Sequence, residues 1–287
     1  MTNSPDVRIP ASARPASAIK RRLDRVVQPG EVHLRKLLAI AAIVWSLAAA
    51  ARGAPPITLG LDHAWIAVAP GAPERKALTR AGFRIAPTVN RHDGQGTASI
   101  TVEFENGFLE FLWPEDSVRV SPELAAAKAK FVAKSNWRTS GASPFAVGLR
   151  RTPSTPPAFP FETWKITADW MGPGEAMEML TPRGSPAVSL FVPAHAVDEA
   201  ANLAAAARGG PDAAMFLHPN GARRLTALRI VSPRPEGFPP SADFIRGSGA
   251  AVRLDLGPAW LMEVTLDNGR QRKTADLRPD LPLLIHY

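Results

Sequence analysis

Cysteine is absent from the 287 residues of this chain, and tyrosine occurs only once. Without cysteine the chain has no disulfide scaffold, no thiol nucleophile and no cysteine-ligated zinc or iron–sulfur site. The single tyrosine leaves few phenol groups for acid–base chemistry. The motifs G-x-S-x-G and G-x-G-x-x-G and Walker-type sequences are also missing, so nucleophile elbows, dinucleotide sites and phosphate loops have no signature here.

The chain has little net charge outside its first 55 residues. Residues 1–55 hold nine basic and three acidic residues, a net of +6, and the other 232 hold 25 and 23, a net of +2. The overall charge of +8 is therefore concentrated at the N-terminus, and nucleic acid is excluded as the main partner. Contents of 45% apolar and 21% charged residues are typical of a chain with a real core, which excludes global disorder.

Residues 1–55 have the parts of a secretory leader. The basic pair Arg35-Lys36 precedes an uncharged, mostly apolar run at 37–51, which ends in small residues suited to signal cleavage. This run is shorter than the roughly twenty apolar residues of a spanning helix. The pattern predicts an exported or cell-envelope protein that contacts the membrane only through this leader. The alternative is an Ala/Leu helix packed on the domain of a cytoplasmic protein.

From Ile57 onward the pattern is one of short strands and short helices. Pro-rich stretches at 153–160 and 233–240 indicate loops, and Gly82 is placed to end a helix. We expect strands over 60–68, 97–105, 108–113, 176–180 and 187–192, and helices over 72–81, 123–134 and 196–208.

The dipeptide Asn106-Gly107 separates two alternating runs, which predicts a hairpin whose turn needs positive φ at both positions. With this turn, Glu103 lies directly opposite Glu110, and their Cβ atoms are about 5 Å apart. We expect one carboxyl pKa of this pair to be raised, unless a cation lies near or both side chains reach water. The opposite face carries only core side chains, namely Ile100, Val102, Phe104, Leu109, Phe111 and Trp113.

The segments LDHAWIAV (61–68) and HDGQGTASITVEFENGFLEFLWP (92–114) resemble the glyoxalase-like branch of the vicinal-oxygen-chelate superfamily. The resemblance covers residues 58–115 well and 143–267 loosely. It implies an α+β fold in which repeated βαβββ modules form curled mixed sheets around a cup. The domain would span 56–287, with a first module at about 58–115 and a divergent second part at about 143–267.

In metal-binding members of that superfamily, the first strand of a module supplies a His and the last strand a Glu. The matching positions here are His63 and Glu110, and His63 alternates with Trp65 away from the apolar residues of its strand. The resemblance therefore implies that these two residues hold a divalent metal ion, with zinc, nickel, manganese and iron all open. His92 and Gln95 match the loop that touches the ligand.

A weak internal repeat extends this comparison to the second half. Residues 225–233 echo 61–70, and residues 260–266 echo 107–113, so that Glu263 stands where Glu110 does. Ala227 occupies the position that corresponds to His63. The second half has thus lost its His ligand, and a full set of two His and two Glu is absent from the sequence.

Two functions from different classes follow from the resemblance. The first is a metal-dependent lyase, isomerase or dioxygenase that chelates a small substrate through two oxygens. In it Glu263 is a third ligand or the general base, and Glu103 is a catalytic acid beside the ion. The second is a non-catalytic module that sequesters a small molecule in the same cup. The partner in both is a small molecule, and a homodimer is compatible with either.

The leader generates a first prediction. We expect residues 1–55 to be removed or inserted in the membrane, because a basic flank precedes an apolar run of signal-peptide length. N-terminal sequencing of protein recovered from the cell envelope measures this. An intact chain that begins near residue 1 in the cytoplasmic fraction would contradict it.

Overall fold

The computed structural model describes residues 57–287, so the predicted leader lies outside the described residues. The strands are β1 (Leu59–Ala67), β2 (Asn90–His92), β3 (Thr97–Phe104), β4 (Gly107–Pro114), β5 (Phe145–Arg151), β6 (Trp164–Ile166), β7 (Met177–Met179), β8 (Ser189–Val192), β9 (Leu225–Ser232), β10 (Val252–Leu256), β11 (Leu261–Leu266), β12 (Thr274–Asp276) and β13 (Leu283–His286). The helices are α2 (Arg75–Arg80), α3 (Ala125–Ser135), α4 (Trp137–Ser140), α5 (Glu199–Arg208), α6 (Pro211–Ala214) and α7 (Ala242–Gly247). Short 3₁₀ turns lie at Pro122–Leu124, Pro235–Gly237 and Asp267–Gly269. None of the helices within residues 57–287 has the length and apolar character needed to cross a membrane.

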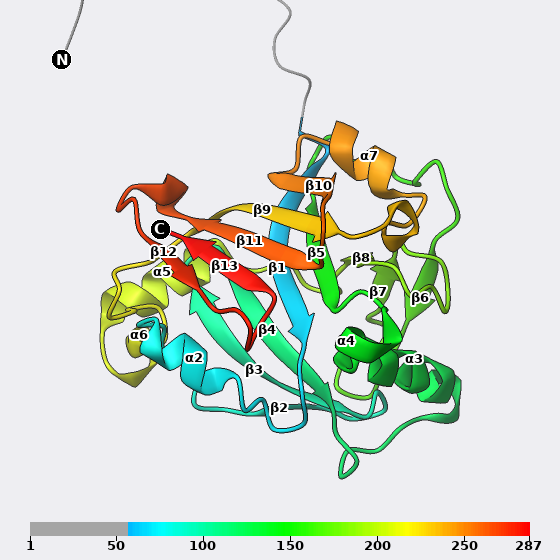
Figure 1. The fold of residues 1–287 in the computed structure, drawn as a ribbon, viewed down its shortest axis with the longest axis horizontal. Coiled ribbons are helices and arrows are strands. Elements are labelled where there is room, and N and C mark those ends of the chain that lie inside the picture. Colours follow the sequence, from blue (N-terminus) through cyan, green and yellow to red (C-terminus); the bar gives the residue numbers. More distant parts are fainter. Residues whose placement is uncertain (1–56) are drawn as a thin grey trace, which may run out of the picture. The chain divides into compact units, whose positions relative to one another are not determined.

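Eight strands form one mixed sheet in the order β2-β3-β4-β1-β5-β8-β7-β6 (Figure 1). The first half is a βαβββ module, in which β1 pairs with β4 in parallel and α2 connects β1 to β2. The second half repeats the strand order around β5, and β1 and β5 join the two halves as an antiparallel pair. The α+β fold of curled mixed sheets built from repeated modules is therefore confirmed.

The second module lacks the helix that the first one has. The chain between β5 and β6, residues 152–163, contains no helix or strand. Four prolines fall in this connection, and proline interrupts helices because it has no N–H to donate. The module therefore keeps the strand pairing without the crossover helix.

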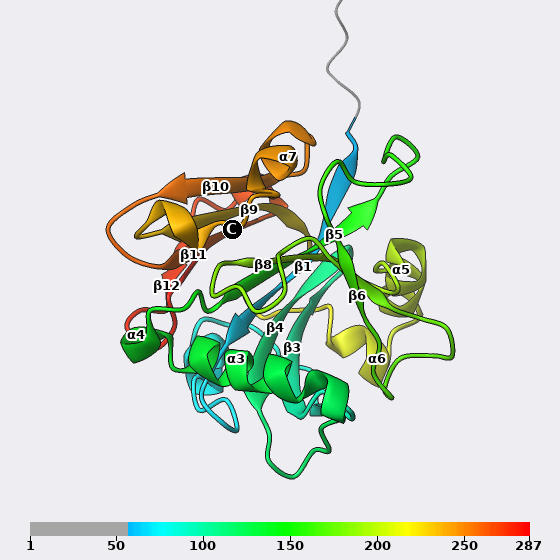
Figure 2. The same ribbon diagram turned by 90° about the vertical axis from the view of Figure 1, so that its right-hand side faces the viewer.

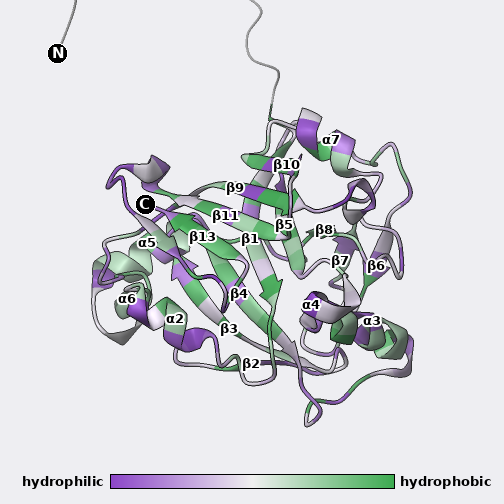
Figure 3. Cartoon of the chain, in the orientation of Figure 1, coloured by the Kyte–Doolittle hydropathy of each residue, from purple (hydrophilic) through white to green (hydrophobic). Residues whose placement is uncertain are grey.

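A second sheet, in the order β10-β9-β11-β13-β12, packs on one face of the eight-stranded sheet (Figure 2). The alternation of apolar and polar residues along the strands determines which face of the eight-stranded sheet the second sheet covers, because every second side chain of a strand points to the same face. The buried side chains Ala64, Ile66 and Phe111 of the first sheet share one core with Ile230 and Met262 of the second. Figure 3 shows hydrophobic residues along β1, β4 and β9, whereas α2 and α7 carry many hydrophilic ones.

The second half of the chain is divided differently from the expectation of one part at 143–267. Strands β5–β8 complete the cup sheet, and the strands from β9 onward form the other sheet. The echo of 61–70 in 225–233 does not reflect equivalent topology, since β1 pairs with β4 in parallel whereas β9 pairs with β11 antiparallel. Similar apolar alternation in two strands is compatible with either pairing.

The β3–β4 hairpin forms, but its predicted turn and register are wrong. The turn residues are Glu105 and Asn106, because Phe104 pairs with Gly107. Glu103 consequently lies opposite Phe108, and Glu110 lies opposite Thr101. The register shift moves each residue to a neighbouring pair without changing its face, so the apolar face predicted from alternation is buried as expected.

Tertiary contacts select this turn. The Asn106 side chain pairs with the main chain of Leu225: its Nδ2 donates to the Leu225 carbonyl at 2.8 Å, and its Oδ1 accepts from the Leu225 N–H at 2.8 Å. Glu105 is buried and forms ion pairs with Arg223 and Arg224. These contacts fix the turn on the start of β9, which a local turn propensity cannot anticipate.

Gly107 is required for space rather than for a positive φ. It is not among the positive-φ glycines of the described chain. A Cβ built on Gly107 would lie 2.5 Å from the Asp62 carbonyl oxygen and 3.1 Å from Leu225 Cδ2. The close approach of β4 to β1 and β9 therefore excludes any side chain here.

This contact generates a second prediction. Gly107→Ala and Gly107→Asn should both destabilise the protein, by on the order of 1–3 kcal/mol, because the new Cβ overlaps backbone that cannot move freely. Thermal or denaturant unfolding measures the loss. The matched control is Gly247→Ala, where an added Cβ meets no atom within 4 Å. Tolerance of asparagine but not alanine would indicate a positive φ at Gly107 and contradict the steric explanation.

Candidate functional site

The candidate site lies on the face of the eight-stranded sheet turned away from the second sheet, which we call the cup face. His63, Trp65 and Ala67 of β1 point to this face, since Ala64 and Ile66 point into the shared core. Cross-strand pairing adds residues of the neighbouring strands to this face, namely Thr97, Thr101, Glu103, Phe108, Glu110, Leu112, Gly148, Ser189 and Phe191. Helix α3 covers one end of the cup face through Phe131, which packs on Leu112 and Trp65.

A β-bulge in β1 brings a carboxylate to His63. The pairing of β1 with β5 skips from Leu61 to His63, so Asp62 is an extra residue without a cross-strand partner. Its Oδ1 lies 2.6 Å from His63 Nδ1. Because a carboxylate only accepts, Nδ1 carries the proton and Nε2 carries the lone pair. A His held in this way can act as a base or as a metal ligand through Nε2.

Asp62 is a candidate site residue that sequence reasoning missed. It is fully buried, and its Oδ2 accepts from the Val197 N–H at 2.9 Å and lies 3.8 Å from Arg150 Nε. Buried carboxylates are rare unless they have partners of this kind. The available signal was an acidic residue inside an otherwise apolar strand, directly before a histidine.

The ring of His63 is enclosed by aromatic side chains and by a glycine. Phe108 stacks on it with ring centroids 4.2 Å apart, and Phe191 meets it edge-on at 5.3 Å. Gly148 on β5 leaves the space that the ring occupies, because a Cβ there would lie 2.6 Å from His63 Cε1. The imidazole is thus held in one orientation, and it is 6% exposed.

Glu103 and Glu110 lie on the cup face as diagonal neighbours, roughly 7–8 Å apart at Cβ for such a pair. Burial raises the pKa of the Glu103 carboxyl above its usual range, and the neighbouring Glu110 carboxylate raises it further. A hydrogen bond with Thr101 and the proximity of His63 oppose this pKa rise. Glu103 therefore tends to hold its proton where an exposed glutamate has released it.

His92 and Gln95 meet at one hydroxyl. His92 Nδ1 lies 3.0 Å from Thr97 Oγ1, and Gln95 Nε2 donates to the same oxygen at 3.0 Å. His92 Nε2 lies 3.7 Å from Glu110 Oε1, so β2 adds a second histidine to the carboxylate pair. Gln95 Oε1 is buried without a hydrogen-bond partner within the described residues, which leaves it able to accept from a ligand.

His218 supports the site from behind. The Arg84 N–H donates to its Nδ1 at 3.0 Å, and its Nε2 donates to the Glu103 carbonyl at 2.9 Å. Burial lowers the pKa of His218, which keeps the ring neutral and able both to accept and to donate. It thus holds the backbone of Glu103 in place.

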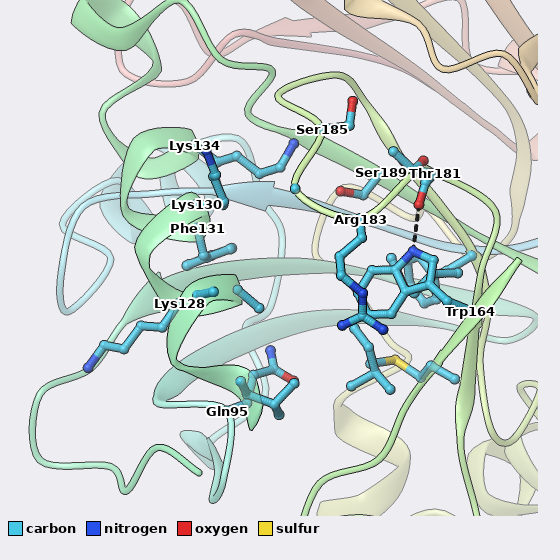
Figure 4. A pocket seen from close by; sticks show the side chains of 18 of the residues that line it. Gln95, Lys128, Lys130, Phe131, Lys134, Trp164, Thr181, Arg183, Ser185 and Ser189 are labelled. Atoms are coloured by element: carbon cyan, nitrogen blue, oxygen red, sulfur yellow. Dashed lines mark hydrogen bonds between the residues drawn. The ribbon is translucent and has the colours of Figure 1, made fainter. Parts of the chain in front are cut away.

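A cavity of about 220 Å³ lies between the cup face and α3 (Figure 4). Its walls are mainly apolar and include Trp65, Leu112, Phe131, Trp164, Ile166, Met177, Met179 and Phe191. Two lining residues connect it to the histidines: Phe191 contacts His63, and Thr97 bonds to His92. The cavity therefore adjoins the ionisable cluster through these two residues, whereas His63, His92, Glu103 and Glu110 are not among its lining residues.

Lys134 of α3 is a second residue that the sequence did not single out. It lines the cavity, is 6% exposed, and donates from Nζ to the Ser143 carbonyl at 3.2 Å and the Ala187 carbonyl at 2.6 Å. Burial lowers the pKa of Lys134 to about 7. The available signal was its position one turn after Phe131, on the buried side of the helix.

A family model of the glyoxalase-like domain matches residues 61–238, more than half of the chain. The chain belongs to the glyoxalase-like domain family. This match confirms the resemblance to the vicinal-oxygen-chelate superfamily, and it includes the whole cup sheet from β1 to β8 apart from the first two residues of β1. Comparison with curated proteins gives no match.

Members of this superfamily often use metal ions, which require a set of His, Asp or Glu ligands in the cup. Within residues 57–287, no group of three or more His, Asp and Glu side chains is arranged to hold a metal ion. His63 and Glu110 share the cup face on neighbouring strands, but two donors are fewer than the three or four that zinc sites use. The described residues therefore do not fit a resident metal.

Glu263, expected as a third ligand or base, is not part of this cup. It lies on β11 of the second sheet, and its Oε1 accepts from Arg229 Nη1 at 2.7 Å, beside Asp255. Its neighbours Met262 and Val264 point into the shared core, so Glu263 points to the outer face. The expectation is wrong because the strand that echoes β4 belongs to a different sheet.

The raised pKa of Glu103 generates a third prediction. Its folded pKa lies above the ordinary value of 4.5, so between these two values the unfolded chain binds fewer protons than the folded one. Stability should therefore fall as the pH rises through this window, and Glu103→Gln should remove that loss. Thermal unfolding from pH 4 to pH 8 measures it, with Glu263→Gln as the matched control. Parallel curves for the parent and Glu103→Gln would contradict the burial of this carboxyl.

Proposed function

We propose that this glyoxalase-like protein is an enzyme that moves a proton on a small carbonyl compound bound in its cup. One observation carries the proposal: the buried Asp62–His63 pair lies on the same face as Glu103, whose carboxyl pKa is raised, and Phe191, which contacts His63, lines an apolar cavity. Burying these groups costs stability, and perturbed ionisable groups beside a cavity are typical of active sites.

His63 and Glu103 suit the two roles of a proton transfer, with His63 as the base and Glu103 as the acid. His63 Nε2 takes a proton from the carbon next to the carbonyl, and the C–H electron pair becomes the double bond of an enolate. Glu103, in its protonated form, donates a hydrogen bond or its proton to the enolate oxygen. Asp62 keeps Nδ1–H oriented and stabilises the imidazolium that forms, as the buried carboxylate of a catalytic triad does. Return of the proton to another atom gives an isomerase, and loss of a leaving group gives a lyase.

His92, Glu110 and Gln95 support binding in this scheme. Gln95 Oε1 has no partner in the described chain and accepts from a ligand hydroxyl. His92 and Glu110 together supply a donor and an acceptor near Thr97. No step passes through a metal ion, because the described residues do not supply a full ligand set.

A second candidate is a non-catalytic module that sequesters a small molecule. It is favoured by the enclosure of His63, whose ring is covered by Phe108 and lies against Phe191. In that case the cavity holds the ligand, and the Asp62–His63 pair only supports the cup. Binding without turnover distinguishes this function from the enzyme.

The fourth prediction tests the enzyme directly. The parent protein should catalyse deuterium exchange at the carbon next to the carbonyl in a panel of small hydroxy- and oxo-carbonyl compounds, followed by NMR in D₂O. His63→Gln should lower the rate roughly 10²-fold or more, a typical loss for a general base. Gly148→Ala should have a similar effect, because its Cβ displaces the His63 ring.

Glu263→Gln is the matched control, since it changes a glutamate of the same kind outside the cup, and its exchange rate should equal that of the parent. The same assay with chelator, and then with added Mn²⁺, Ni²⁺, Zn²⁺ or Fe²⁺, should give the same exchange rate, because the proposed step does not pass through a metal ion. Exchange by the parent that persists in His63→Gln would reject the proposed base. Ligand binding without exchange would favour the sequestering module.

A further inference from the structure

Three cationic side chains converge on the loop that connects β7 to β8. Lys134 Nζ donates to the Ala187 carbonyl of this loop at 2.6 Å. Lys130 lies beside Gly184, since its Cε would be 3.9 Å from a Cβ built there. Arg183 belongs to the loop itself, and Figure 4 shows it across the cavity from the lysines of α3.

These cations have no carboxylate partner among the described residues. Lys134 contacts two main-chain carbonyls, and the Arg183 guanidinium lies 4.0 Å over the Trp164 ring, which leaves its in-plane N–H groups available. By contrast, Lys128 on the same helix pairs with Asp116 at 3.2 Å. A buried ammonium without a counter-charge is unfavourable, and an anion placed beside it would relieve this cost.

The rest of the cavity is mainly apolar, although its lining also includes Gln95, Thr97, Lys128, Thr181, Ser185 and Ser189. Trp65 and Leu112 form its floor on the cup face, and Trp164, Met177 and Met179 form its far wall. Glu123, in the 3₁₀ turn that precedes α3, is the one acidic residue among the lining residues. A ligand that matches these walls is apolar along its body and negatively charged at one end.

We propose that the cavity binds an apolar molecule ending in a carboxylate, which lies against the Arg183–Ala187 loop beside Lys134, Lys130 and Arg183. The apolar body extends along Trp65 and Trp164 toward Phe191, whose ring contacts His63 edge-on. This inference rests on the proposed function and names its substrate class: a carboxylic acid whose reacting carbonyl is remote from the carboxylate.

Binding of three probes of equal length tests the charge requirement: octanoate, octan-1-ol and octylamine, titrated by calorimetry into the parent protein. Octanoate should bind about tenfold or more tightly than octan-1-ol, since a hydrogen bond to a charged group is worth that much, and octylamine should bind most weakly. The double variant Lys130→Gln/Arg183→Gln changes two exposed residues and should abolish most of this preference. Lys134→Met should reduce it further.

Lys128→Gln is the matched control, because Lys128 is paired with Asp116, and it should keep the preference of the parent. Equal affinity for octanoate and octan-1-ol, or an unchanged preference in the double variant, would overturn the carboxylate inference and leave the proposed enzyme standing. No binding of any probe would overturn the cavity as a ligand site. Normal octanoate preference in a His63→Gln variant without exchange activity would support both the carboxylate site and the separate catalytic role.

Discussion

The eight-stranded sheet can bury only one of its faces against the second sheet, and the rest of the molecule depends on this constraint. Alternation along β1, β3 and β4 places the large apolar side chains in the shared core. The other face of the same strands must then be covered by something else. Helix α3 covers one end of it, and the space that remains is the cavity beside the histidines.

Polar groups on that second face are expensive to bury, and several of them have a specific partner. His63 is oriented by Asp62, and the backbone of Glu103 is held by His218. Glu103 itself is compensated incompletely, which appears as its raised pKa. Lys134 is left with carbonyl partners only. A buried polar group that lacks a full set of partners near a cavity can bind a ligand or take part in a reaction. A purely structural core would have apolar side chains in place of such groups.

The glycines at 107 and 148 show how the same constraint sets the site. Gly107 lets β4 approach the main chain at Asp62, and Gly148 gives the His63 ring its place. The turn at Glu105-Asn106 joins this arrangement to the second sheet through Leu225 and the arginines at 223 and 224. Stability of the sandwich and geometry of the cup are therefore coupled through one hairpin.

Periodicity in the sequence by itself determined which face of each strand is buried. Side chains alternate between the two faces of a strand, so the observed shift in the hairpin pairing leaves every side chain on its predicted face. It therefore placed His63, Glu103 and Glu110 on one face, and the motif around them identified the family. The turn of the hairpin was decided by Asn106 pairing with a main chain 119 residues away, which no local pattern encodes. A β-bulge in β1 places Asp62 beside His63. Glu263 lies outside the cup because β11 belongs to the second sheet. Lys134 is buried because its Nζ donates to carbonyls on two distant loops. Each of these depends on which segments meet in space, and that is determined by tertiary packing.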